Sequence, residues 1–245
     1  MSYELHYWPT ILGRGEFVRL ALEAAGAPYV DVARGRDDQG QGVAAMQRTM
    51  DDAAQPHPPF APPFLKDGKI LVGQTAAILH YLAPALKLVA RNEQARVWTQ
   101  QIQLTIADLV TEAHDTHHPI ANSLFYEDQK AEAQRRAADF CRTRLSKYLH
   151  WFERILAHNP AGPRHLVGGR LSYADLSLFQ VVEGLRYAFP RAMAQAQAKG
   201  LALLVLQLHQ RVQAQPRVAA YLRSPRRLAF NEQGIFRRYP ELDLV

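Results

Sequence analysis

The chain has 245 residues, of which 48% are hydrophobic and 21% charged, so it can bury a full core and has an ordinary globular composition. Its one cysteine, Cys141, excludes an intramolecular disulfide and suits a reducing cytoplasm. No secretory signal is visible at the start, and the apolar run at 201–206 is too short to span a bilayer. We therefore expect a cytoplasmic protein that does not act at a membrane.

The formal net charge of +6 raises the question of nucleic-acid binding. Six arginines lie between Arg217 and Arg238, with only Glu232 to offset them. They could attract anionic ligands, or they could be solvated arginines whose stems cover apolar surface. No zinc-finger spacing and no aromatic–basic RNA motif accompanies them, so we do not expect a nucleic-acid partner.

The first third of the chain predicts a small mixed domain. Residues 4–7 alternate like a half-buried strand, and residues 17–24 carry the apolar face of a helix that ends at Gly26. Residues 28–33 follow as a second strand. This order predicts a right-handed crossover between parallel strands. The segment 34–62, rich in Gly, Asp, Gln and Pro, should be a mobile loop with one short helix near 43–50.

The most informative segment is a hairpin followed by a helix. Asp67-Gly68 is expected to form the turn between a strand after Pro63 and a strand over 69–72. Gln74 and Thr75 then open a helix with apolar residues at helical spacing. Free N–H groups at such a helix start bind carboxylate or phosphate.

The rest of the chain is predicted to be helical. After a linker at 84–91, apolar periodicity marks a long helix through 97–110 and another over 128–158. Ser172 and Asp175 have the spacing of a capping box, with Asp in place of the usual Glu, just before an apolar run.

Three motifs carry a family resemblance. The pattern P-x-L-x-D-G at 63–68, followed by Gln-Thr at a helix start, resembles the glutathione-binding half of cytosolic glutathione transferases. Residues 167–175 and 216–225 are similar to that family's helical domain, and the resemblance covers about residues 3 to 225. It implies an α/β thioredoxin-like domain (βαβ–ββα), then an all-α domain that forms the electrophile pocket. The corresponding ranges are 1–83, a linker at 84–91, and 92–245.

Tyr7-Trp8-Pro9 followed by Gly13-Arg14 resembles the tyrosine type of the family, nearest to its sigma, pi, mu and alpha group, with the look of a bacterial member. The resemblance implies that Tyr7 stabilises the thiolate of glutathione, which attacks small apolar electrophiles. A hydroxyl can do this by hydrogen-bonding the charged form of the sulfur. One extra residue separates Pro9 from Gly13, so Thr10 competes as the hydroxyl donor. Glutathione is a co-substrate, and no other cofactor is implied.

The resemblance also assigns the glutathione contacts. Gln74 and Thr75 would hold the γ-glutamyl carboxylate, with Arg14 near the same end of the tripeptide. Asp108 would reach across a homodimer interface toward the γ-glutamyl amine of the second site, although it also fits a solvent-facing helix position.

Two prolines would border the cysteinyl residue of glutathione. Pro63 corresponds to the family's cis-proline, and its neighbour Pro62 has no N–H to donate, so one of two backbone hydrogen bonds would be missing. Basic contacts from the second-helix region have three unranked candidates, which are Arg34, Arg36 and Arg48.

The electrophile pocket should combine the first loop, the middle of the long helix and the C-terminus. His114 and His118 fall there. Together with His117 and Asp115 they place three imidazoles and a carboxylate at helical spacing, which also resembles a metal site. Because Pro119 ends the helix at once, we expect pocket-lining or surface histidines and no metal. The alternative to an enzyme is a noncatalytic binding or structural protein of the same fold, as in lens crystallins. The insertion between Pro9 and Gly13 and the proline at position 62 favour that alternative.

Overall fold

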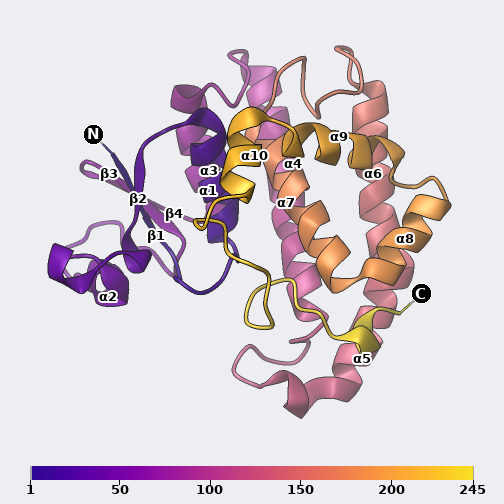
Figure 1. The fold of residues 1–245 in the computed structure, drawn as a ribbon, viewed down its shortest axis with the longest axis horizontal. Helices are drawn as coiled ribbons and strands as arrows, with labels where there is room; N and C mark the ends of the chain where they lie inside the picture. Colours follow the sequence, from indigo (N-terminus) through magenta and orange to yellow (C-terminus); the bar gives the residue numbers. More distant parts are fainter. Residues whose placement is uncertain (1, 245) are drawn as a thin grey trace.

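The computed structural model describes residues 2–244, and its N-terminal part is built on a four-stranded sheet with the order β2-β1-β3-β4 (Figure 1). Strand β1 (Tyr3–His6) runs parallel to β2 (Tyr29–Asp31), as the strand–helix–strand order predicted. On its other side β1 pairs antiparallel with β3 (Phe64–Asp67), which pairs with β4 (Ile70–Gly73).

Strand alternation divides the core of this domain between the two faces of the sheet. Leu5 and Leu65 point toward α1 (Gly15–Ala25) and α3 (Thr75–Leu86), with which they form one apolar cluster. Phe64 points the other way and packs with residues of α2 (Gly42–Met50), the short helix that the sequence predicted. Helix α1 ends at Gly26 with φ 67°, as expected.

Three boundaries differ from the sequence-based prediction. The hairpin loop is Gly68-Lys69, one residue later than predicted, because Asp67 pairs with Ile70 and so belongs to the strand. Of the two loop residues only Gly68 has positive φ. The second strand stops at Asp31 and continues as a 3₁₀ turn. Helix α3 runs on to Leu86, into the segment expected to be linker.

The C-terminal part is all helical and centres on α7 (Tyr173–Ala188), which contacts α1, α4 (Glu93–Asp115) and α9 (Leu203–Gln213). The predicted capping box is present, since Ser172 accepts from the N–H of Asp175 and Asp175 accepts from the N–H of Ser172 at 2.7 Å. The remaining helices are α5 (Lys130–Asp139), α6 (Leu145–His158), α8 (Pro190–Ala198) and α10 (Pro216–Leu222).

After α10 the chain continues as an extended segment, 223–244, which lies across the helical part (yellow in Figure 1). It is anchored where Ile235 and Phe236 are buried, and Phe236 packs directly on Gly184 of α7. None of the helices within residues 2–244 is long and apolar enough to cross a membrane.

Candidate active site

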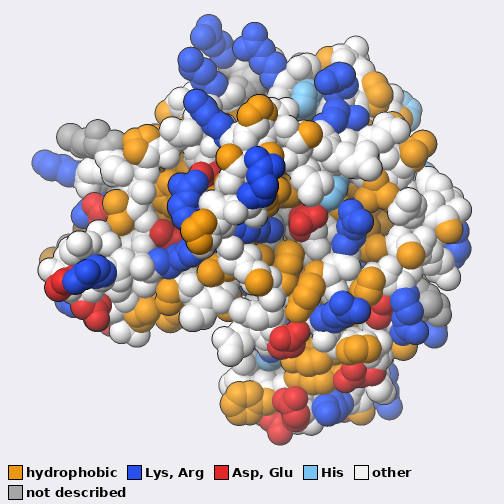
Figure 2. Space-filling model, in the orientation of Figure 1, with side chains coloured by type: hydrophobic (Ala, Val, Ile, Leu, Met, Phe, Trp, Pro, Cys, Tyr) orange, Lys and Arg blue, Asp and Glu red, His pale blue; other side chains and the backbone are white. Residues whose placement is uncertain are grey.

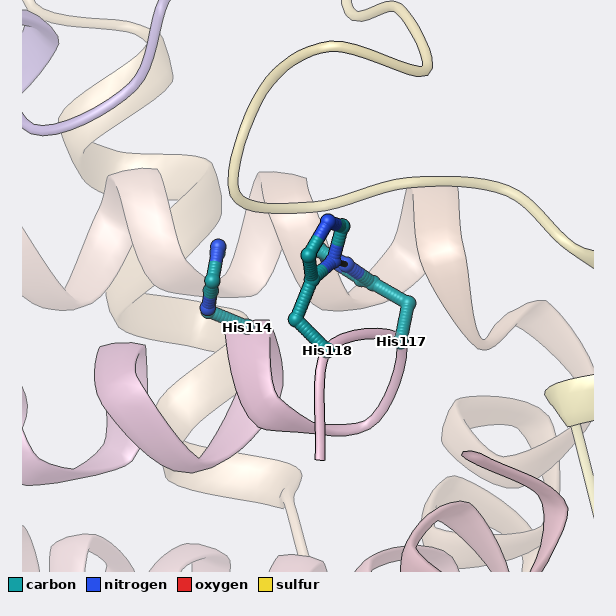
Figure 3. Close-up of side chains that lie close together, drawn as sticks. All are labelled: His114, His117 and His118. Atoms are coloured by element: carbon teal, nitrogen blue, oxygen red, sulfur yellow. Dashed lines mark hydrogen bonds between the residues drawn. The ribbon is translucent and has the colours of Figure 1, made fainter. Parts of the chain in front are cut away.

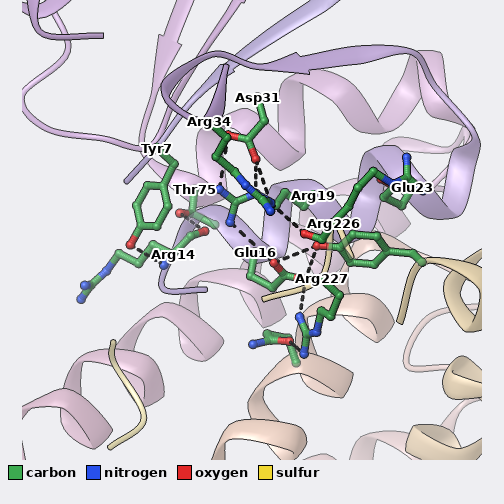
Figure 4. Close-up of polar contacts among 12 residues, drawn as sticks. Tyr7, Arg14, Glu16, Arg19, Glu23, Asp31, Arg34, Thr75, Arg226 and Arg227 are labelled. Atoms are coloured by element: carbon green, nitrogen blue, oxygen red, sulfur yellow. Dashed lines mark hydrogen bonds and ion pairs between the residues drawn. The ribbon is translucent and has the colours of Figure 1, made fainter. Parts of the chain in front are cut away.

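Tyr7 lies just after β1 with its side chain only 4% exposed. Its hydroxyl oxygen accepts a hydrogen bond of 2.8 Å from the backbone N–H of Arg14 (Figure 4). The ring lies against two glycines. A Cβ atom at Gly13 would be 2.0 Å from the hydroxyl oxygen, and one at Gly15 would be 2.4 Å from the ring. Both glycines are therefore required for this position of Tyr7.

Tyr7 keeps its proton in this environment. Burial raises the pKa of its phenol, and the Arg14 N–H and the charges of Arg14 and Arg19 only partly oppose that rise. The guanidinium of Arg19 lies 5.7 Å from the centre of the Tyr7 ring. At neutral pH the phenol is neutral, with its oxygen engaged by Arg14 and its O–H available to donate to an acceptor.

Arg14 connects Tyr7 to the start of α3. Its carbonyl accepts a hydrogen bond of 3.3 Å from the hydroxyl of Thr75 (Figure 4). The preceding residue, Gln74, is exposed and adopts φ 64°. Ile78 is the first residue of α3 whose N–H bonds back along the helix, so the N–H groups of 75–77 have no partner within the helix. Tyr7, Arg14 and Thr75 thus form one cluster, with an anion-binding helix start beside it.

The extra residue before Gly13 is accommodated in an exposed loop. The side chain of Thr10 is exposed, and its carbonyl accepts a hydrogen bond of 3.0 Å from Asn231 of the C-terminal segment. The insertion therefore leaves Tyr7 packed at the end of β1.

The other predicted glutathione contacts come from three further parts of the chain. Phe64 pairs with His6 and with Gly73, so Pro62 and Pro63 enter the sheet beside Tyr7 and Gln74. The peptide bond between Pro62 and Pro63 is cis and immediately precedes β3. Asp108 is exposed on α4, and within residues 2–244 no hydrogen bond or ion pair joins it to Arg14. Arg34 lies 3.5 Å from Asp31, with which it forms an ion pair.

The predicted pocket histidines lie at the C-terminal end of α4, beneath the C-terminal segment (Figure 3). His114 and His118 are half-buried and His117, between them, is buried; the ring of His117 is held by the carbonyl of Ile235 at 2.8 Å. Helix α4 ends at Asp115, so His114 lies in its last turn and His117 and His118 lie just beyond it; that they line the electrophile pocket stays a prediction.

One small cavity lies where the first loop meets the C-terminal segment. A cavity of about 10 Å³ lies between Leu12, Gly13 and Gln180, where Phe230 and Phe236 of the C-terminal segment fill the volume. Two larger, open cavities lie elsewhere on the sheet domain. One, of about 640 Å³, is lined by residues of and around β2, and the other, of about 830 Å³, lies between β1 and α2.

Sequence reasoning missed a buried ionic cluster that joins the two parts of the chain (Figure 4). The fully buried carboxylate of Glu16 accepts hydrogen bonds from Arg227 and from the Tyr221 hydroxyl. On its other side Arg19 bonds to Asp31 at 2.6 Å. Partners more than 200 residues apart leave no local pattern from which the sequence could have revealed them.

This cluster also explains part of the basic C-terminal stretch. Arg226 pairs with Glu23 at 3.1 Å, and Arg217 donates to the carbonyl of Ala25, so these arginines and Arg227 bind α1. On the face shown in Figure 2, basic side chains are interspersed with apolar and acidic ones.

A thioredoxin-like sheet domain followed by an all-helical domain is the architecture of glutathione S-transferases. Residues 114–225 match the family described as "Glutathione S-transferase, C-terminal domain". The chain is 26% identical to Glutathione S-transferase 2 of Onchocerca volvulus over 225 residues, covering 90% of this chain and 92% of that one. It is 25% identical to Glutathione S-transferase P 1 of Xenopus laevis, covering 92% and 94% of the two chains.

A solved structure agrees. The Pi-class glutathione S-transferase of Onchocerca volvulus superimposes with a TM-score of 0.70 at 24% identity, covering 96% of this chain and 99% of that one. The chain is thus similar to glutathione S-transferases over most of its length, and it shares their fold.

Proposed function

We propose that this protein conjugates the thiolate of glutathione to small apolar electrophiles, with Tyr7 as the group that stabilises the thiolate. Relatives named glutathione S-transferase support the reaction class. The observation that carries the role of Tyr7 is its hydrogen bond from Arg14, which occupies the phenolic oxygen and leaves the O–H free to donate. On this ground we propose that the protein is of the tyrosine type; a bacterial origin stays a prediction.

The chemistry follows from the thiol. A free cysteine thiol has a pKa of about 8.5, so most of it is protonated at neutral pH. A hydrogen bond from Tyr7 stabilises the charged sulfur and shifts this equilibrium toward the thiolate, which is the nucleophile. The Arg14 N–H strengthens the donor by polarising the phenol. The sulfur then attacks an electrophilic carbon and forms the thioether, while the leaving group departs with its bonding electron pair, as chloride does from chlorodinitrobenzene.

The other end of the tripeptide would lie at the start of α3. There the N–H groups of 75–77 and the Thr75 hydroxyl suit the γ-glutamyl carboxylate, with Gln74 and Arg14 beside them. The cysteinyl backbone would run along Pro62 and Pro63, of which neither can donate an N–H. No further cofactor is required for this reaction, and we assign the protein to the cytoplasm.

We further propose a homodimer. Several large apolar side chains are exposed, and three of them suit an interface: Phe60 at 94%, Val97 at 60% and Leu104 at 51%. Val97 and Leu104 are seven residues apart on α4, and Asp108 is four residues beyond, so all three share one helix face. A second copy on this face would bury the apolar pair and allow Asp108 to reach the γ-glutamyl amine in the other site.

One observation favours the noncatalytic alternative. The cavity between Leu12, Gly13 and the C-terminal segment is only about 10 Å³, which is too small for an electrophile, so an electrophile would have to reach the sulfur from another side of Tyr7. His114 and His118 border that approach as pocket residues. A protein that binds glutathione but has no such access would be a binding protein of this fold.

Conjugation of glutathione to a chlorodinitrobenzene acceptor separates these proposals. Wild-type activity with a loss of about 10-fold or more in Tyr7→Phe supports Tyr7 as the activating group. Thr10→Ala should retain wild-type activity. Loss in Thr10→Ala with full activity in Tyr7→Phe would transfer the role to Thr10. Calorimetric binding of glutathione without any conjugation would establish the noncatalytic protein.

A further inference from the structure

The three histidines at the end of α4 converge on one point. His114, His117 and His118 each offer a ring nitrogen, and these nitrogens all lie within 4.8 Å of one another (Figure 3). The rings are packed pairwise, with centroids 4.8 to 5.1 Å apart. Nothing in the proposed thiol chemistry requires three imidazoles in contact.

The hydrogen bonds fix which nitrogen faces the centre. The Nε2 of His117 lies 2.8 Å from the carbonyl oxygen of Ile235, and a carbonyl can only accept, so Nε2 carries the proton. The Nδ1 of His117 therefore carries a buried lone pair, which accepts a hydrogen bond of 2.6 Å from Nδ1 of His118; a metal bound to both nitrogens would take the place of that proton. A carbonyl that fixes the tautomer in this way is the usual support of a metal-binding histidine.

His114 has a comparable support. Its Nδ1 lies 3.4 Å from the carboxylate of Asp115, which favours a proton on that nitrogen and leaves Nε2 as the donor to a metal. Thus His114 and His117 each direct one nitrogen to an oxygen acceptor, which leaves the other nitrogen as the one that can bind a metal.

The rings are also in the protonation state that binds metals. Burial lowers the pKa of all three, to about 2 for His117 and about 4 for His118, and the charge of Arg237 adds to the effect. At neutral pH each imidazole is uncharged. The nearby charges of Arg14 and Arg237 oppose any cation, so only metals with a strong preference for imidazole nitrogen suit the site.

We propose that His114, His117 and His118 bind one transition-metal ion of the zinc, copper or nickel group, with the segment around Ile235 above it. Tetrahedral zinc lies about 2.0–2.1 Å from each nitrogen, which sets the nitrogens about 3.4 Å apart. To reach this spacing, the Nδ1 atoms of His117 and His118 would move apart from 2.6 Å by under about 1 Å. The most widely separated ligand nitrogens, 4.8 Å apart, would approach by about 1.4 Å. Small side-chain rotations allow both movements. Three protein ligands leave a fourth position open for water or another ligand.

Metal titration of the full, tag-free chain tests this site. Because glutathione and thiol reductants bind zinc themselves, the buffer contains neither. We expect one equivalent of Zn²⁺ to bind in calorimetry with a Kd of micromolar or below. Co²⁺ should give the intense visible bands of a tetrahedral nitrogen site, and Cu²⁺ should bind more tightly than Zn²⁺. Ca²⁺ and Mg²⁺ should not compete.

Variants identify the ligands. His114→Ala and His118→Ala remove half-buried rings and should each weaken Zn²⁺ binding by 10-fold or more, whereas His80→Ala, at an exposed position on α3, should bind as the wild type does. Circular dichroism checks that each variant is folded. Wild-type affinity in both His114→Ala and His118→Ala, or no binding of Zn²⁺ to the wild type, would overturn the proposal. The test needs no conjugation activity, so it stands apart from the proposed function.

Discussion

The backbone N–H of Arg14 donates a hydrogen bond of 2.8 Å to the phenolic oxygen of Tyr7, at the point where the first loop enters α1. The loop before it carries one residue more than the family pattern, yet this contact is formed. The glycine that precedes Arg14 makes it possible, since it has φ 45° and brings the backbone against the hydroxyl.

Replacing that glycine should displace Tyr7. In Gly13→Ala the new Cβ would lie 2.0 Å from the Tyr7 oxygen, so the ring or the loop must shift. We expect conjugation to fall about 10-fold or more, with glutathione affinity changed less. Gly40→Ala is the matched control, because Gly40 also has positive φ but nothing lies within 4 Å of a Cβ there. Equal activities in the two variants would mean that Tyr7 is not positioned by this contact.

His6 should make the fold sensitive to acid. Its side chain is 2% exposed and stacked on Phe64, with neither ring nitrogen hydrogen-bonded. Burial lowers its pKa to about 4, against about 6.5 in the unfolded chain. Between these values the unfolded chain binds a proton that the folded chain does not, so stability is lost as the pH falls, by up to about 3 kcal/mol.

His6→Leu should remove the part of the acid sensitivity that comes from protonation of His6 in the unfolded chain. Urea unfolding at pH 7.5 and at pH 5 should show that the variant gains about 2 kcal/mol on the wild type between the two conditions. A constant difference between the two proteins at both pH values would contradict the depressed pKa of His6.

Local patterns predicted much of the fold. The sequence predicted the capping residues Ser172 and Asp175 and the helix end at Gly26. It could do so because each of these features depends on hydrogen bonds to backbone groups only a few residues away. The hairpin turn was predicted one residue early, because Asp67-Gly68 signals a turn while the pairing of Asp67 with Ile70 sets its position.

The site was predictable only in part. Tyr7 follows β1 and Thr75 begins α3, and the sequence predicted both of these boundaries. The family resemblance therefore allowed us to expect that both residues lie near Arg14. The contacts of Asn231 with Thr10, and of Ile235 with His117, join residues more than 100 positions apart. They depend on the path of the C-terminal segment, which has no periodic pattern to predict it.

The anchor of that segment should contribute strongly to stability. Arg227→Met removes a partner of the fully buried Glu16 and leaves its charge less compensated, so we expect a loss of about 3 kcal/mol in urea unfolding. The double variant with Glu16→Gln should lose less than the sum of the single changes. Arg223→Met, at an exposed position nearby, should be nearly neutral. Strict additivity in the double variant would show that the pair is not coupled.

The proposed dimer can be broken at one side chain. Leu104→Glu places a charge on the exposed apolar face of α4, close to Asp108, and should sediment as a monomer at micromolar concentration where the wild type is a dimer. Leu203→Glu changes a leucine on α9 that is even more exposed, at 62%, and should leave the dimer intact. A wild type that sediments only as a monomer would refute the assembly.

The central claim, that Tyr7 stabilises the thiolate, is tested most directly by the pKa of the thiol of bound glutathione. Ultraviolet absorbance of the thiolate, followed as a function of pH in the binary complex, measures it without any electrophile. We expect the thiol to titrate below its ordinary pKa of about 8.5 on the wild type, and at least about one unit higher on Tyr7→Phe. The same thiol pKa on both proteins would contradict the account.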